Sequence, residues 1–124
     1  MEQKNSDKGK ILFVGRDIFL GTMVSQAVLK EGFGSQAVAP LKVREAVASD
    51  PSIMAIVIDL KESREHLTEI VDAAGTGNHP RLIGIAFHTD LESKRQAQKA
   101  GLDHVIHRSQ IQSHLVQLLS EKKA

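Results

Sequence analysis

The chain of 124 residues contains no cysteine, tryptophan or tyrosine, and phenylalanine alone supplies its 3% aromatic content. The absence of cysteine excludes disulfide bonds, thiol catalysis and cysteine-ligated zinc, and it favours a cytoplasmic location. So few aromatic residues, with no recognition motif, argue against a nucleic-acid-binding surface. The net charge of +1 likewise argues against binding a polyanion through bulk charge.

Long apolar runs are also missing from the chain. None approaches the roughly 20 residues that a membrane-spanning helix needs, so we expect no membrane insertion. The composition, 41% hydrophobic and 25% charged, is that of an ordinary globular protein, and the length suits one domain. Residues 1–9 are polar and predict a flexible lead-in, which leaves a single domain over residues 10–121.

Strand-like and helix-like segments alternate along the rest of the sequence. Short apolar runs predict strands at 11–14, 36–39, 53–59, 82–87 and 104–107. Amphipathic segments predict helices at 18–31, 40–50, 63–74, 91–100 and 111–121. We find no nucleophile–base pair and no phosphate-binding loop among these segments, so we do not expect an enzyme.

Five βα units of this size predict an α/β fold, a doubly wound three-layer sandwich. Its five-stranded parallel sheet should have the order 2-1-3-4-5, as in flavodoxin-like folds. This order places the carboxyl ends of the first and third strands side by side. Asp59, which ends the most apolar strand, should therefore neighbour the turn that contains Gly15, Arg16 and Asp17. Open α/β sheets place their functional sites at this edge.

Element order, length, Asp59 and the pair Ala100 and Gly101 at the end of the fourth helix resemble the receiver domain of two-component response regulators. The resemblance covers nearly the whole chain, about residues 10–121. It implies a role in bacterial signal transduction, with protein partners such as a histidine kinase or another pathway regulator. It also makes Asp59 the equivalent of the phosphorylated aspartate. Homodimerisation is left open.

The acids that hold magnesium in receiver domains are not matched here. The family carries two of them directly after the first strand, where this chain has Gly15 and Arg16. Asp17 lies one position beyond, where it fits a helix N-cap better than a metal ligand. Magnesium prefers carboxylate and water oxygens in near-octahedral geometry, and Asp59 with a displaced Asp17 is a poor set.

Other receiver positions are altered as well. The hydroxyl residue at the end of the fourth strand is replaced by Ala86, followed by Phe87. The lysine after the fifth strand is replaced by Arg108, and the aromatic switch position is Val105. Of the family's phosphorylation site, only Asp59 remains.

Three interpretations of Asp59 follow. The first is a structural acid at the strand end, either capped or salt-bridged, and the expected salt bridge is with Arg16, Arg108 or both, without metal or phosphate. The second is phosphorylation, and the third is anion or ligand binding by the two arginines. We favour the ion pair.

The six histidines do not predict a metal site, because none of them has the helical spacing of a zinc motif. His104 and His107 are three apart in a strand and should face opposite sides. We expect no cofactor. A pH-sensitive surface that includes His104, His107 and His114 is left open, since histidine titrates near neutrality.

The helix at 91–100 is polar, which fits a docking surface, because receivers generally bind partners through this helix and the strand and helix that follow it. The predicted partner face consists of Lys94, Arg95, Gln98, His104 and Val116. We therefore predict a stand-alone pseudo-receiver that acts as a phosphorylation-independent protein–protein interaction module. The alternative is an atypical response regulator phosphorylated on Asp59.

Overall fold

The computed structural model describes residues 8–75 and 80–120. In this part of the chain five strands form one parallel sheet in the order β2-β1-β3-β4-β5, as predicted. The strands are β1 (Lys10–Val14), β2 (Gly34–Val38), β3 (Ile53–Asp59), β4 (Arg81–Ala86) and β5 (His104–His107). Residues 1–7 of the predicted lead-in lie outside the described residues, so that part stays a prediction.

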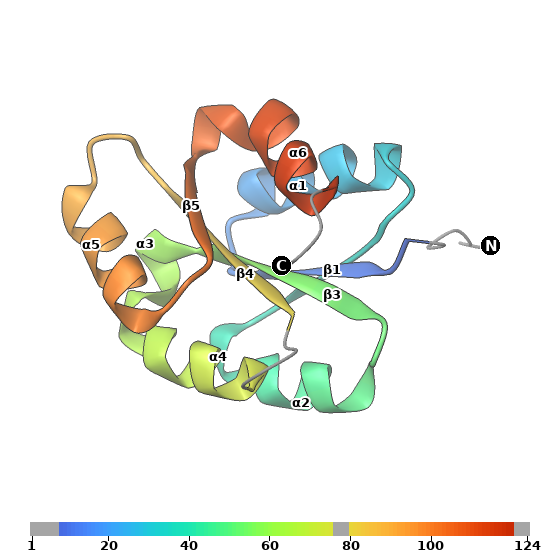
Figure 1. The fold of residues 1–124 in the computed structure, drawn as a ribbon, viewed down its shortest axis with the longest axis horizontal. Coiled ribbons are helices and arrows are strands. Elements are labelled where there is room, and N and C mark those ends of the chain that lie inside the picture. Colours follow the sequence, from blue (N-terminus) through green and yellow to red (C-terminus); the bar gives the residue numbers. More distant parts are fainter. Residues whose placement is uncertain (1–7, 76–79, 121–124) are drawn as a thin grey trace.

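Helices cover both faces of the sheet (Figure 1). One face carries α1 (Ile18–Lys30), a π-helical segment η4 (Ile111–Leu115) and α6 (Val116–Ser120). The other carries α2 (Val43–Ser49), α4 (Leu67–Ala74) and α5 (Leu91–Ala100). The remaining short elements are η1 (Pro40–Lys42), α3 (Leu60–Ser63), η2 (Arg64–His66) and η3 (Arg108–Gln110). The predicted doubly wound sandwich is confirmed.

Two helices differ from their predictions. The helix predicted at 63–74 begins at Leu60, directly after β3, and is interrupted by the 3-10 turn η2. No glycine or proline follows Asp59 to delay the helix, and the chain turns at once to bury Leu60, which is 1% exposed. The last helix opens with the π-helical segment η4 instead of regular α-helix.

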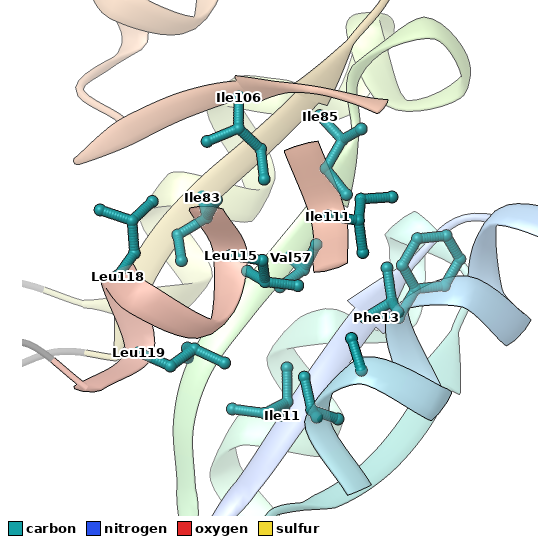
Figure 2. Packing of buried hydrophobic residues seen from close by; sticks show 14 of the residues in the cluster. Ile11, Phe13, Val57, Ile83, Ile85, Ile106, Ile111, Leu115, Leu118 and Leu119 are labelled. Carbon is teal, nitrogen blue, oxygen red and sulfur yellow. The ribbon is translucent and has the colours of Figure 1, made fainter. Parts of the chain in front are cut away.

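The core has two halves, one on each face of the sheet. Along β1, Ile11 and Phe13 point toward α1 and belong to the first half, whereas Leu12 and Val14 belong to the second. Figure 2 shows the first half, where strand residues meet Ile111 and Leu115 of η4. Burial on both faces explains why the strands are continuous apolar runs.

Membrane insertion was not expected from the sequence. Among residues 8–75 and 80–120, no helix is long and apolar enough to cross a membrane.

Gly84 should be one of the least tolerant positions of the sheet. A Cβ atom there would lie 2.9 Å from Cδ2 of Leu102 and 2.9 Å from Cδ1 of Leu60. We expect Gly84→Ala to lower the free energy of unfolding by about 1–3 kcal/mol, the usual cost of overpacking a core. Urea denaturation measures this, with Gln117→Ala as the control, because Gln117 is an exposed residue of α6. An unchanged midpoint for Gly84→Ala would show that the two leucines move aside freely.

Candidate functional site

The carboxyl ends of β1 and β3 lie side by side, as the predicted strand order requires. Val14 pairs with Ile58, so Gly15 and Asp59 follow at the same edge. Gly15 has φ +154°, and a Cβ atom on it would lie 3.0 Å from Cβ of Asp59. The predicted proximity is confirmed, and the close approach explains why glycine occupies this position.

Asp59 is an almost completely buried acid with 5% of its surface exposed. Burial raises its pKa above the ordinary value of 3.8, and the negative charges of Glu62 and Asp17 raise it further. The backbone N–H groups of Glu62 and Lys61 lower the pKa but do not cancel the burial. The site therefore favours a protonated, uncharged Asp59 more strongly than water does.

The predicted ion pair between Asp59 and Arg16 is wrong. Arg16 contacts Glu62 instead, with its Nε 3.5 Å from Oε2 and its backbone N–H donating to Oε1 at 2.6 Å. The arginine side chain stays 77% exposed. Pairing with Asp59 would strip water from the guanidinium, whereas Glu62 offers a carboxylate at the surface.

The predicted pairing of Arg108 with Asp59 is also wrong. Nη1 and Nη2 of Arg108 lie 3.4 Å and 3.5 Å from Oδ2 of Asp17. Oδ1 of the same Asp17 accepts the N–H of Leu20 at 3.0 Å, which confirms the predicted N-cap of α1. The Leu20 N–H, together with the charge of Arg108, lowers the pKa of Asp17.

The contact between Asp17 and Arg108 joins loops that are far apart in the sheet. Asp17 follows β1 and Arg108 follows β5, and the ends of β3 and β4 lie between them. The bridge therefore spans the sheet edge at which Asp59 lies. Arg108, at the position of the receiver lysine, contacts Asp17 and Phe87 instead of Asp59.

Phe87 is a further member of this edge, and its partners were not predicted. Cζ of Arg108 lies 4.9 Å from the centroid of its ring, and Nζ of Lys61 lies 5.6 Å from it. Cation–π contacts at such exposed sites contribute about 0.5–1 kcal/mol each. We call Asp17, Arg108, Phe87 and Lys61 the strand-end network, because it links the loops after β1, β5, β4 and β3. The sequence did contain a signal for this network. The predicted strand order places the cations that follow β3 and β5 beside the aromatic residue that follows β4.

The residues at this edge do not fit the magnesium ion that receiver domains use. Gly15 and Arg16 supply no carboxylate at the two acid positions. The carboxylate of Asp17 is engaged by Leu20 and Arg108, and that of Glu62 by Arg16. In the described part of the chain, no three His, Asp or Glu side chains converge as metal ligands.

The positions that transmit phosphorylation in receivers are apolar here. Ala86 at the end of β4 is buried, with 3% of its surface exposed. Val105 in β5 is half-buried and packs against the core half on the α5 side. Neither side chain can form a hydrogen bond to a phosphoryl group.

The predicted partner face is only partly assembled. Arg95 and Gln98 are exposed on α5, and Arg95 pairs with Glu92 at 2.8 Å. Lys94 is half-buried, and its Nζ lies 3.4 Å from the carbonyl oxygen of His88. The prediction that Val116 is an exposed apolar residue is wrong, because it is half-buried against the core. The π-helical segment before it changes the rotation of the chain and brings Val116 inward.

The histidines of β5 do not form one surface. His104 alternates with Val105, so it faces the α1 side, and His107 faces the α5 side. The rings of His107 and His88 are 6.1 Å apart between centroids. Burial lowers the pKa of His107, and the charges of Lys94 and His88 lower it further. A joint surface of His104, His107 and His114, which the sequence left open, is therefore not formed, because His104 and His107 lie on opposite faces of the sheet.

Asp59→Asn should stabilise the protein at neutral pH. The pKa of Asp59 in the folded state is raised above its ordinary value of 3.8. The charged carboxylate therefore lowers the free energy of unfolding at pH values above the folded-state pKa, and this loss of stability is absent below pH 3.8. The gain over wild type should therefore shrink as the pH falls through the folded pKa toward 3.8. Urea denaturation at about pH 7 and about pH 4 measures both halves of this prediction.

Asp17→Asn is the matched control for this pH dependence. Asparagine keeps the helix cap, so only the charge is lost. Because the pKa of Asp17 is lowered, its charge stabilises the fold at neutral pH, and this contribution disappears as the pH falls through the lowered pKa. The two variants should shift the midpoint in opposite directions. A destabilised Asp59→Asn at neutral pH would contradict the assignment of Asp59 as a buried, charge-disfavouring position.

Comparison with known proteins gives matches at the level of structure alone. No protein-family model matches the sequence, and no curated protein sequence matches it either. Among solved structures, NtrX from Brucella abortus matches with a TM-score of 0.74 at 15% identity, over 89% of this chain and 25% of NtrX. The chain thus spans a quarter of the length of NtrX.

Two further matches cover nearly the whole of the solved chain. The receiver domain of NtrX has a TM-score of 0.72 at 14% identity, with 91% of this chain and 100% of that domain covered. A response regulator from Thermotoga maritima has a TM-score of 0.72 at 15% identity, with 91% and 99% covered. The protein therefore has the fold of response regulator receiver domains.

Proposed function

We propose that the protein is a cytoplasmic, non-enzymatic receiver-like module that works by binding signalling proteins and not by accepting a phosphoryl group. The observation that carries the proposal is the surroundings of Asp59. The acid is 5% exposed, burial raises its pKa, and the negative charges of Glu62 and Asp17 raise that pKa further.

Phosphoryl transfer to an aspartate needs the opposite environment. The transition state spreads negative charge over the oxygens of the transferred group, and catalysis consists largely of positioning and of positive clamping. Here the two arginines at the edge are paired with Glu62 and Asp17. A phosphoryl group at Asp59 would meet the added negative charge of Glu62 and Asp17. This arrangement supports an unphosphorylated resting state as the working form.

The coupling between such a site and a docking surface is also missing. A ligand shifts a conformational equilibrium only when it binds the two states differently. Ala86 and Val105 offer no group that distinguishes a phosphorylated from an unphosphorylated Asp59. Binding that is always available is the function best suited to these residues.

The surface of α5 supports docking. Leu91 is 65% exposed at its first position, and Arg95 and Gln98 are exposed further along. Lys94 and Lys99 add positive charge to the same helix. An apolar residue beside several cations suits a partner with an acidic and partly apolar surface.

The second candidate function is an atypical response regulator phosphorylated on Asp59. It is favoured by the position of Asp59 at the carboxyl end of β3, next to Gly15. The solved structures that share this fold include a response regulator from Thermotoga maritima.

Incubation with acetyl phosphate and magnesium separates the two candidates. We expect the intact mass of the protein to stay unchanged, because Asp59 is buried, acid-flanked and without a magnesium site. Asp59→Asn serves as the control for modification elsewhere. An added phosphoryl group on the wild type that is lost in Asp59→Asn would overturn the proposal and establish the alternative.

Docking through α5 is tested by affinity capture with immobilised variants. Lys94→Glu combined with Arg95→Glu should weaken the retained partner by about tenfold or more, because like charges across an interface are strongly unfavourable. Asp59→Asn should retain the partner as the wild type does. Lys42→Glu is the matched control, since Lys42 is 67% exposed and pairs with Glu45 three residues away, as Arg95 does with Glu92.

The reverse pattern would contradict the docking proposal. If Asp59→Asn folds but loses the partner, while the α5 variant binds normally, the function depends on Asp59 and not on α5.

A further inference from the structure

A hollow of about 320 Å³ lies between α4 and α5. Figure 1 shows these two helices on the face of the sheet opposite α1. None of its lining residues belongs to the strand-end network. It is lined by Arg64, Leu67, Thr68, Gln96, Lys99 and Ala100. Two of these residues are cations, two are neutral hydrogen-bonding residues, two are apolar, and no acid is among them.

Arg64 is held in place from one side of the hollow. Its Nη2 donates to Oγ of Ser93 at 3.0 Å and lies 3.6 Å from Oδ2 of Asp90. Asp90 is itself fixed as the N-cap of α5 through the N–H and hydroxyl of Ser93. Both contacts use one nitrogen, Nη2. The N–H groups on Nε and Nη1 have no partner among the described residues and are therefore available to a ligand. The guanidinium is thus oriented before any ligand arrives.

Lys99 supplies the second cation. It is exposed in the last turn of α5 and makes no hydrogen bond or ion pair with the part of the chain that the structure describes. The hydroxyl of Thr68 likewise has no hydrogen-bond partner among residues 8–75 and 80–120. Both groups can donate a hydrogen bond to a ligand without breaking an existing contact.

Two acids on the neighbouring turns, Glu92 and Glu69, already have partners. Glu92 contacts Arg95 at 2.8 Å, and its other oxygen accepts from Gln96 at 3.2 Å. Glu69 contacts His66 at 2.9 Å. No acid lines the hollow itself, so its lining carries the positive charge of Lys99 and the donors of Arg64 that Asp90 and Ser93 do not use.

We propose that this hollow binds a phosphate group, either as the free dianion or as the monoester of a small molecule. An unused guanidinium N–H of Arg64, the ammonium of Lys99 and the hydroxyl of Thr68 can each donate to a different oxygen of one phosphate. A singly charged carboxylate would use only part of this set. Leu67 and Ala100 leave an apolar wall for the organic part of a monoester.

The site goes beyond the proposed function, because it does not involve Asp59 and its ligand is a small anion. Lys99 belongs both to the hollow and to the proposed docking helix α5. The site also has a structural consequence. Arg64 contacts the N-cap of α5, so an occupied site would act on the residue that connects η2 to the start of this helix.

The test is an NMR titration of the isotope-labelled full chain with inorganic phosphate and, separately, with glycerol 3-phosphate. Sodium chloride at equal ionic strength controls for screening. We expect saturable shifts confined to the amides around Arg64, Thr68, Gln96 and Lys99. Lys99→Gln and Arg64→Gln should each weaken binding by about tenfold or more, the usual effect of losing a charge-assisted hydrogen bond.

Arg95→Gln is the matched control, since Arg95 lies on the same helix but does not line the hollow, and it should change the affinity less than about twofold. Arg64→Gln also loses its contacts to Ser93 and Asp90, so Lys99→Gln is the decisive variant if Arg64→Gln does not fold. Tighter binding of glycerol 3-phosphate would identify a small-molecule ester as the ligand, and equal binding would identify free phosphate. Shifts that chloride reproduces, or equal affinity of Lys99→Gln and wild type, would overturn the proposal.

Discussion

The burial of β3 on both faces is the constraint on which the rest of the strand-end region depends. Six of its seven residues are buried, and the two halves of the core meet along it. The last buried residue is Asp59, so the strand that stabilises the sheet also carries a carboxyl group out of water. Desolvation makes the charged form of that group unfavourable. The neighbouring charged side chains therefore lie beside an acid that is difficult to ionise, and this affects which partners they choose.

The arginines illustrate this effect most directly. Moving a guanidinium to Asp59 would remove two charges from water, and the desolvation of a buried pair often exceeds the attraction between its partners. Arg16 and Arg108 instead find carboxylates at or near the surface, on Glu62 and Asp17. Such exposed pairs contribute only about 0–1 kcal/mol each. They therefore set the positions of loops more than they stabilise the fold.

Much of this arrangement could be predicted from the sequence. Apolar runs and helix stripes determine the order of elements, and the handedness of βα crossovers then determines the sheet order. The cap by Asp17 and the proximity of Gly15 to Asp59 follow from those two rules. The partners of Arg16 and Arg108 do not, because long side chains can reach several acids, and the choice depends on hydration energies at particular positions. Val116 was misplaced for a similar reason, since a π-helical segment leaves no clear mark in the pattern of apolar residues.

The cations near the carboxyl ends of the strands are directed toward one another's loops and away from Asp59. Arg108 and Lys61 both contact the ring of Phe87, Arg16 contacts Glu62, and Arg64 contacts the N-cap of α5. In a protein that switches between two conformations, these contacts would have to differ between the two, so that a ligand could bind one conformation more tightly than the other. Here the contacts are made between the protein's own side chains, and Asp59 takes no part in them. In the described part of the chain, side chains of the protein itself thereby link the strand-end loops, and this supports the proposed phosphorylation-independent binding.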